Sequence, residues 1–402
     1  MVTNNSINSL NLQGVIQPQS GAYDVDELVK YLAPIHAKNV NVDFGVNTYT
    51  HGITAAASYF GSVYSPTQNR VYFVPYRQSD ETDFHYLNCD TGEIIAYTHG
   101  ATIVDNGYKG GVYSPNEDRI YFCPCEQAAE TNWHYIDCSD GTVVAYEHGV
   151  TAVIQGYEGG CYSPTQDRIY FSPYDQGAET NWHYIDCSDG TVVAYEHGVT
   201  STTNSGAVYS PTQDRIYFVP KGQSDDTYWF YIDCSDGSVG SYENGVGIGN
   251  NAFSGGAYSP TQNRIYMAPS GTYSQNATFT YLDCDDTTVH TYTSPSPRPG
   301  INAFNGGVYS PTQNRIYFVP YLQSSVIYWY YIDCNTGILT SYLSNVTAVN
   351  YGYQGGTYVP TLDRIYLAPS YQAPQTTWHY IQSYAQAEIA PQVMSNGLFN
   401  KF

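Results

Sequence analysis

Short runs in which hydrophobic and polar residues alternate make up most of the chain, and turn-forming residues separate them. In residues 159–195 the runs are GGCYSP, RIYFSP, WHYIDC and TVVAY, with Thr-Gln-Asp, a polar loop and Ser-Asp-Gly between them. A period of two, with many aromatic and β-branched residues between turn residues, is typical of β-strands joined by tight turns. We therefore predict four strands here, named A (159–164), B (168–173), C (182–187) and D (191–195).

The same pattern occurs seven times. The shared wording is G-G-x-Y-S-P-T-Q-[ND]-R-I-Y-F-x-P, then a variable stretch, then W-H-Y-I-D-C-x-[TD]-G-x-V-x-x-Y. Its arginines are 47 to 51 residues apart, at Arg70, Arg119, Arg168, Arg215, Arg264, Arg315 and Arg364. A repeat of about 50 residues with several short strands is the signature of a β-propeller blade. One blade cannot bury its own faces, so neighbouring blades must stack, and seven can close a ring without an exposed sheet edge.

The two ends of the repeat region complement each other. The seventh copy has strands A to C but reads YIQSYAQAE where strand D should follow, whereas residues 46–52 (VNTYTHG) match strand D of the first full copy, residues 94–100 (IIAYTHG). We therefore expect an all-β fold, a seven-bladed β-propeller of four-stranded antiparallel blades, closed by an N-terminal outer strand in the last blade. The propeller spans 41–386, between an N-terminal arm with a short helix (1–40) and a C-terminal tail (387–402).

The charge balance argues against several classes of partner. The net charge is -22, and seven of the 14 Lys and Arg residues are the repeat arginines. Few cations remain for the rest of the surface, so we expect no nucleic-acid partner and no docking on an anionic membrane. No apolar run approaches the length of about 18 residues that spans a membrane, and the first residues lack the basic and apolar regions of a signal peptide. We therefore expect neither membrane insertion nor classical secretion.

The repeat divides the predicted propeller into two faces. The A–B and C–D turns agree closely among the copies and lie on one side, which we call the turn face. The B–C loops and D–A connections vary from copy to copy and lie on the other side, which we call the loop face. Binding residues usually lie on loops held by a rigid scaffold. We therefore predict that the loop face is the functional surface.

Aromatic and amide residues at the B–C loops are the candidate ligand-binding set. All five tryptophans start or lie near strand C, and four of them follow a polar variable loop with Gln127, Gln176, Gln223 or Gln323. The set is Trp133, Trp182, Trp229, Trp329, Trp378, Gln127, Gln176, Gln223 and Gln323. Flat aromatic rings beside amides are a plausible platform for a sugar or a peptide. The alternative is packing between blades, with each indole N–H satisfied at the rim.

Charged residues of the repeat favour a structural interpretation. Each repeat arginine begins strand B, and the aspartate of I-D-C ends strand C, so the two are adjacent in an antiparallel pair. The expected pairs are Arg119–Asp137, Arg168–Asp186, Arg215–Asp233, Arg264–Asp283 and Arg315–Asp333. Asn88 and Gln382 take the aspartate's place in the first and last copies. We interpret these pairs as ties within each blade.

Histidines and cysteines also follow the repeat. Eight of the ten histidines fall at two repeat positions, and six of the nine cysteines fall at one. Equivalent positions in successive blades are too far apart for disulfides, so we expect buried free thiols. No Ser-His-Asp set, paired carboxylates or phosphate loop occurs once and only once. We therefore predict no enzymatic activity, no cofactor and no metal.

The repeat resembles kelch-type propellers in its I-Y-x-x strand, its aromatic strand ending in Asp, and its Thr-Gly or Asp-Gly turn. It differs in that its double glycine, as in Gly159-Gly160, precedes the I-Y-x-x strand. The Y-S-P-T-Q-N-R-I-Y-F-V-P wording is similar to uncharacterised propeller-repeat proteins of aquatic phages and large viruses. That resemblance implies a particle-associated role.

We therefore expect a non-enzymatic structural and recognition module on a virion or phage tail, reached after cytoplasmic synthesis, that binds protein or glycan through its loop face. The arm and tail would contact other virion or surface proteins, and a host glycan or receptor is a further expected partner. The alternative is a kelch-like lyase or oxidase with a site at the ring centre. Its mark would be titratable residues that break the symmetry there.

Overall fold

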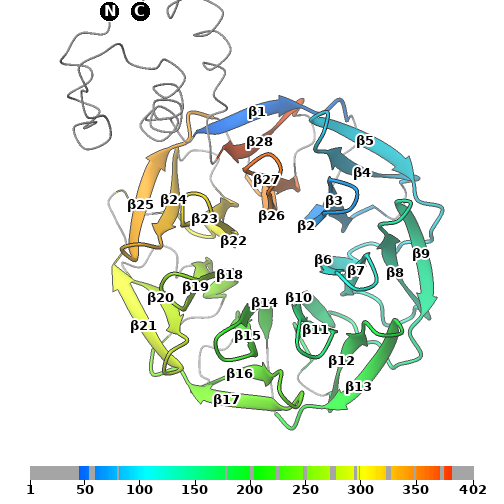
Figure 1. Cartoon of the computed structure of the whole chain (residues 1–402), viewed down its shortest axis with the longest axis horizontal. Helices are drawn as coiled ribbons and strands as arrows, with labels where there is room; N and C mark the ends of the chain where they lie inside the picture. Colours follow the sequence, from blue (N-terminus) through cyan, green and yellow to red (C-terminus); the bar gives the residue numbers. More distant parts are fainter. Residues whose placement is uncertain are drawn as a thin grey trace, which may run out of the picture. The chain divides into compact units, whose positions relative to one another are not determined.

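Seven small sheets surround a common axis in this computed structural model (Figure 1). The structure describes residues 45–53, 59–78, 81–176, 179–199, 203–222, 227–247, 251–271, 278–293, 297, 299–322, 327–346, 350–371 and 375–382. The expected N-terminal arm and helix, the C-terminal tail, and the outermost residues of the expected 41–386 propeller lie outside the described residues. Residues 45–383 cluster as one compact unit.

Each sheet is one blade of four antiparallel strands, which run from strand A at the axis to strand D at the rim (Figure 1). The fold is therefore the predicted seven-bladed β-propeller. The strands of blades 1 to 7 in that order are β2 (Tyr59–Ser65), β3 (Arg70–Pro75), β4 (Asp83–Asn88), β5 (Glu93–Thr98); β6 (Tyr108–Ser114), β7 (Arg119–Pro124), β8 (Asn132–Asp137), β9 (Thr142–Glu147); β10 (Tyr157–Ser163), β11 (Arg168–Pro173), β12 (Asn181–Asp186), β13 (Thr191–Glu196); β14 (Asn204–Ser210), β15 (Arg215–Pro220), β16 (Tyr228–Asp233), β17 (Val239–Glu243); β18 (Phe253–Ser259), β19 (Arg264–Pro269), β20 (Thr278–Asp283), β21 (Thr288–Thr293); β22 (Phe304–Ser310), β23 (Arg315–Pro320), β24 (Tyr328–Asp333), β25 (Ile338–Leu343); and β26 (Tyr353–Val359), β27 (Arg364–Pro369), β28 (Thr377–Gln382), β1 (Val46–Thr50).

The ring closes as the sequence predicts. β1 is the outer strand of the seventh blade and pairs with β28 in antiparallel register, from Val46 opposite Ile381 to Thr50 opposite Thr377. In Figure 1 the N-terminal strand, in blue, lies beside the C-terminal strand, in red. Residues from the two ends of the propeller thus share one hydrogen-bonded ladder, which leaves the last blade with the same four strands as the others.

Seven glycines bring the inner strands together at the axis. Each is the third residue of strand A, has a φ between +76° and +95°, and lies at a bulge in its strand. A Cβ on any one of them would lie 3.0–3.6 Å from the Cα of the next, and the contact from Gly355 to Gly61 completes the circle. Because only glycine accepts both this conformation and this approach, the first glycine of the repeat's double glycine has a structural cause. The seven are Gly61, Gly110, Gly159, Gly206, Gly255, Gly306 and Gly355.

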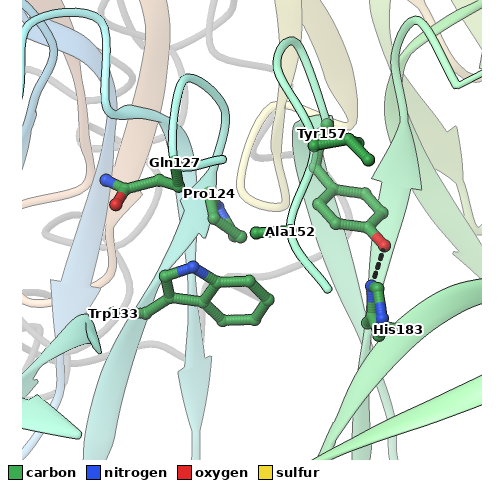
Figure 2. A pocket seen from close by; sticks show the side chains of 8 residues that line it. Pro124, Gln127, Trp133, Ala152, Tyr157 and His183 are labelled. Carbon is green, nitrogen blue, oxygen red and sulfur yellow. Dashed lines mark hydrogen bonds between the residues drawn. The ribbon is translucent and has the colours of Figure 1, made fainter. Parts of the chain in front are cut away.

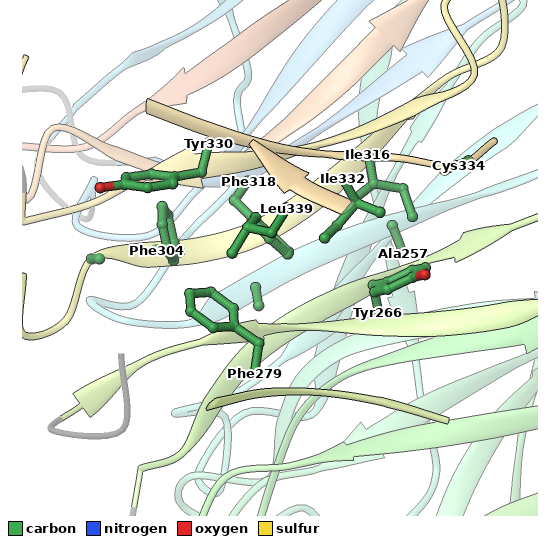
Figure 3. Close-up of a cluster of buried hydrophobic side chains, with 12 residues drawn as sticks. Ala257, Tyr266, Phe279, Phe304, Ile316, Phe318, Tyr330, Ile332, Cys334 and Leu339 are labelled. Carbon is green, nitrogen blue, oxygen red and sulfur yellow. The ribbon is translucent and has the colours of Figure 1, made fainter. Parts of the chain in front are cut away.

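The hydrophobic cores lie between neighbouring blades. Figure 3 shows one of them, in which Tyr266 and Phe279 of blade 5 meet Phe304, Phe318 and Ile332 of blade 6. All five of these side chains are at most 1% exposed. Burying a large apolar side chain contributes about 1.5–3 kcal/mol. This packing explains why a repeat with 16% aromatic residues forms stacked blades.

The repeat arginines stabilise the turn face. Each guanidinium lies 4.3–4.5 Å from the ring centroid of the strand C tyrosine in its blade. The five expected Arg–Asp pairs are opposite each other in register. Ion pairs join Arg168 to Asp186 at 3.9 Å, Arg215 to Asp233 at 3.4 Å and Arg264 to Asp283 at 3.1 Å. In blade 2 the ion pair of Arg119 is made to Glu117 instead, at 2.6 Å.

Hydrogen bonds also link the turns of successive blades. A threonine hydroxyl in one A–B turn donates to the Asp or Asn side chain of the next turn, at 2.7–2.9 Å. The last of these, from Thr361 to Asn69, joins blade 7 to blade 1. The accepting Asp and Asn residues have φ values of +50° to +53°, a conformation these residue types tolerate. These turns therefore form a belt around this face, in which Asn116 takes the place of the threonine in blade 2.

Candidate functional site: the loop face and its axial cluster

The five candidate tryptophans are core residues. Each is at most 1% exposed and lies near the loop-face end of strand C. Trp133, Trp182 and Trp378 stack on the histidine that follows strand D of the same blade, with ring centroids 4.1–4.3 Å apart. No acceptor for any of the five indole N–H groups occurs within the described residues. Their burial favours the alternative that these tryptophans pack between blades. That alternative also expected each indole N–H to find a hydrogen-bond acceptor at the rim, which is not what the described residues show.

The candidate glutamines Gln127 and Gln176 are also buried, at 2% and 4% exposure. Their side-chain amides donate to the carbonyls of Gly107 and Gly156, which holds the D–A connection against the B–C loop. Gln223 and Gln323 lie outside the described residues. A cavity of about 10 Å³ lies among Gln127, Trp133, Tyr157 and His183 (Figure 2). That volume holds at most one water molecule and no ligand.

The repeat histidines are buried and hydrogen-bonded. The four in strand C each bond, through Nδ1, to the tyrosine that begins strand A, as in Tyr157–His183 at 2.6 Å (Figure 2). Burial lowers the pKa of His134, His183 and His379 to about 4. These three side chains are therefore neutral near pH 7.

The histidines that follow strand D have a fixed ring orientation. His148 Nδ1 accepts a hydrogen bond from the Val150 amide at 3.2 Å, so its Nε2 carries the proton and donates to the Glu130 carbonyl at 2.8 Å. His99 and His197 repeat this arrangement. Both ring nitrogens are occupied by backbone, which assigns these side chains to structure.

The nine cysteines are free thiols, and eight of them are buried. Burial raises the pKa of the repeat thiols, to about 12 for Cys138 and Cys187. A thiol with so high a pKa is a poor nucleophile and a poor metal ligand. Within the described residues, no group of three or more His, Cys, Asp or Glu side chains is placed to hold a metal ion.

Exposed hydrophobic side chains gather on the loop face. Among the described residues, eight large hydrophobic side chains are 40% or more exposed, and seven of them lie in D–A connections, in B–C loops or at the loop-face ends of strands. Those seven are Ile154, Tyr228, Ile301, Ile327, Leu343, Tyr351 and Tyr371. Ile338, at the start of β25, is the one on the turn face. The loop face therefore exposes more large apolar side chains than the turn face does within the described residues.

Two columns of the repeat meet around the axis on this face. One is the second residue of strand A and the other is the residue that follows strand B; together we call them the axial cluster. From blade 1 to blade 7 the first column is Phe60, Lys109, Glu158, Ser205, Ser254, Asn305 and Gln354, and the second is Tyr76, Cys125, Tyr174, Lys221, Ser270, Tyr321 and Ser370. The sequence analysis missed this cluster. Its signal is a strand A position that changes its chemistry in nearly every blade while its neighbours stay constant.

A buried ion cluster occupies one side of the axial cluster. Glu158 is 2% exposed and bonds Lys221 at 2.9 and 3.0 Å and Lys109 at 3.2 Å. The Ser205 hydroxyl donates to the same carboxylate. Burial by itself raises the pKa of Glu158, but the ammonium groups of Lys221 and Lys109 outweigh burial and lower the pKa to about 2. The carboxylate is therefore ionised and fully engaged, and the three residues carry one net positive charge.

An aromatic arc occupies the other side, over blades 6, 7 and 1. Tyr321, Tyr351 and Tyr371 contact one another in sequence, with ring centroids 5.2 and 5.8 Å apart. The Arg77 guanidinium lies 5.3 Å from the Tyr371 ring centroid and 5.6 Å from that of Tyr76. Tyr351 and Tyr371 are 43% and 45% exposed. The arc thus has two partly exposed tyrosine side chains beside a cation.

Comparisons with known proteins support the fold and nothing finer. No protein-family model and no curated protein sequence matches the chain. Similar solved structures include hydrazine synthase from Kuenenia stuttgartiensis (12% identity, 84% of this chain and 100% of that chain, TM-score 0.60). They also include a chain of the mitotic checkpoint complex (10%, 92% and 98%, 0.57) and YCF48 bound to a D1 peptide (7%, 84% and 95%, 0.56).

Fold and comparisons together define the class: the chain is a seven-bladed β-propeller repeat protein. At these identities the likeness carries no activity from one protein to another. Within the described residues, no helix is both long enough and apolar enough to cross a membrane.

Proposed function

We propose that this propeller is a non-enzymatic recognition module that binds a protein or glycan partner through its loop face. The observation that carries the proposal is the distribution of exposed hydrophobic side chains, seven of eight on that face. The turn face is instead tied by the arginine contacts and the threonine belt. Binding residues usually lie on variable loops that a rigid scaffold holds in place. In this proposal the loop face carries the binding residues and the turn face is the scaffold.

The chemistry of the axial cluster favours recognition over catalysis. Both carboxylate oxygens of Glu158 accept hydrogen bonds from lysines. A carboxylate with a pKa of about 2 is a weak base near neutral pH, and the repeat histidines are engaged by tyrosines or backbone. The lyase or oxidase alternative retains one supporting observation, since Lys109, Glu158 and Lys221 break the ring symmetry with titratable groups. A metal-content assay on the pure protein addresses that alternative.

The proposed setting is the surface of a virion or phage tail. The likeness of the repeat wording to propeller-repeat proteins of phages and large viruses supports it, and the kelch-like layout adds nothing beyond architecture. YCF48, a neighbour of similar fold, is described as bound to a peptide, which shows that such a fold accommodates one. Mass spectrometry of purified particles tests the setting; we expect the chain in the particle fraction, and its absence from every fraction would contradict it.

Selection of ligands from a random peptide library tests the use of the loop face and does not require the natural partner. We expect the selected peptides to lose binding to a loop-face variant, Ile154→Ser with Tyr351→Ser. A turn-face variant that also removes exposed apolar surface, Ile338→Ser, is the matched control and should bind as the native chain does. Peptides that bind the loop-face variant unchanged and fail on the turn-face variant would reverse the assignment.

A further inference from the structure

The cations outside the repeat converge on one place. Among the described residues, the only Lys or Arg residues other than the seven repeat arginines are Arg77, Lys109 and Lys221. Lys109 and Lys221 belong to the axial cluster, and Arg77 follows its member Tyr76. The Arg77 guanidinium and the Lys109 ammonium lie 5.6 and 5.9 Å from the centroid of the same Tyr76 ring. In a chain of net charge -22, the described cations outside the repeat are thus concentrated at one place on the loop face, beside the carboxylates of Glu158, Glu126 and Asp175.

The lysine pair keeps binding capacity beyond Glu158. An ammonium has three N–H donors. Within the described part of the chain, the Lys109 ammonium has a single acceptor, Glu158 Oε2, and otherwise faces the rings of Tyr174 at 4.1 Å and Phe60 at 5.6 Å. Lys221 lies 4.7 Å from the Tyr174 ring and its side chain is 20% exposed. Because Lys109 is only 8% exposed, the exposed part of the Lys221 side chain is what this pair offers to an anionic group.

The aromatic arc supplies the second half of a binding site. The rings of Tyr351 and Tyr371 are flat, apolar and partly exposed, and the Arg77 side chain donates to the Tyr371 hydroxyl. The C–H face of a pyranose ring is also flat and apolar, and packs on such rings, while the hydroxyls at their edges provide hydrogen bonds. Tyr76 links this arc to the lysine pair.

We propose that the axial cluster and the aromatic arc together bind an acidic carbohydrate, a short oligosaccharide with a carboxylate or sulfate group. The sugar ring packs on Tyr351 and Tyr371, and its anionic group binds Arg77 and the exposed part of Lys221. This inference rests on the proposed function, since it names the ligand class of the loop face. A dense polyanion is excluded from the proposal because the net charge of the chain repels it.

Matched sugars test the proposal by isothermal titration calorimetry on the full chain. The probes are galacturonic acid trisaccharide, galactose trisaccharide, and galactose trisaccharide sulfated at C6, which share one ring and differ at C6. We expect at least tenfold tighter binding of one acidic probe than of the neutral one, and weaker binding at high salt. The tighter acid distinguishes carboxylate from sulfate. Equal affinities for all three, or no binding, would overturn the proposal.

Single substitutions show which side chains contribute to binding of the acidic sugar. Arg77→Gln removes an exposed cation and should weaken acid binding at least fivefold, with the melting temperature unchanged. Ala194→Glu, at the outer rim, changes the net charge by the same amount and is the control. Tyr371→Ala should weaken binding, whereas Tyr228→Ala, equally aromatic and exposed but outside the arc, should not. Equal losses in target and control variants would contradict the site.

The failure of this inference can be told from failure of the proposed function. If the acidic sugars do not bind but the loop-face variant still abolishes binding of selected peptides, the ligand class is wrong and the recognition surface stands. If the selected peptides are rich in Asp and Glu and lose binding with Arg77→Gln while the sugars do not bind, the ligand is an acidic peptide and the sugar assignment is wrong.

Discussion

The turn face and the loop face are built from the same seven repeats and differ in what the repeats keep constant. On the turn face, the arginine and the Asp or Asn recur in all seven blades and the threonine in six, with nearly the same contacts in most of them. On the loop face, the column from Phe60 to Gln354 holds an aromatic, a cation, an anion, hydroxyls and amides. Duplication therefore preserves the side that holds the blades together and diversifies the side that is free to contact a partner.

Removal of β1 should have the largest effect and would affect both faces. Deletion of residues 1–52 removes the strand that pairs with β28, so an unpaired edge is exposed in blade 7. We expect aggregation or loss of most of the free energy of unfolding. Deletion of residues 1–20 is the control and should leave the melting temperature unchanged. A monomeric 53–402 fragment with the native melting temperature would contradict the closure.

Substitution of an axial glycine tests the convergence of the inner strands. The Cβ of Gly159→Ala would lie 3.1 Å from the Gly206 Cα, whereas that of Gly198→Ala, at a similar positive φ, meets nothing within 4 Å. The control isolates the cost of positive φ, about 1 kcal/mol, and the clash adds about 2 kcal/mol or more. Chemical denaturation measures both. Equal losses would show that the glycine ring relaxes freely.

Acidification should destabilise the blades through the strand C histidines. Because the folded state holds the pKa of His134, His183 and His379 at about 4 against the usual 6.5, the unfolded chain binds more protons between these values. Stability is then complete above pH 6.5, falls as the pH drops through that window, and levels off below 4. Each histidine contributes up to about 3 kcal/mol. Melting curves of native and His183→Gln protein should converge as the pH falls; parallel curves would contradict this.

A pair of arginines separates scaffold from recognition. Arg215→Gln loses the Asp233 ion pair and the contact with Tyr231, so we expect a loss of about 1 kcal/mol in stability and no change in ligand binding. Arg77→Gln should do the opposite. Denaturation and calorimetry on the same two proteins measure both effects. An Arg215→Gln protein of native stability with lost binding would exchange the roles of the two faces.

The fold was predictable because the same pattern of strands and turns occurs seven times in the sequence. The closure followed from one missing strand and one matching segment, residues 46–52. The expectation for the tryptophans did not hold as a surface platform, because a sequence does not show whether the second residue of a strand faces a neighbouring blade or solvent. The sequence also could not show whether Gln127 and Gln176 bind a ligand or the backbone. Only the fold brings the carbonyls of Gly107 and Gly156 to the side-chain amides of these two glutamines.

The axial cluster could not be assembled from sequence. Lys109, Glu158 and Lys221 are up to 112 residues apart and come together only because successive blades place strand A at one axis. A substitution within one blade also changed the partner of the repeat arginine, since Arg119 forms an ion pair with Glu117, where five other copies carry glutamine and the last carries Leu362. Departures from a repeat are therefore the positions at which sequence reasoning is weakest and functional interest is greatest.

Hydrogen–deuterium exchange of the native chain with a bound library-selected peptide tests the division between the faces most directly. The account predicts new protection in the D–A connections and at the loop-face ends of strands A and B around Tyr76, Lys109 and Lys221. Peptides that carry the A–B and C–D turns should exchange as in the free protein. Protection confined to those turns, with the loop face unchanged, would contradict the central claim.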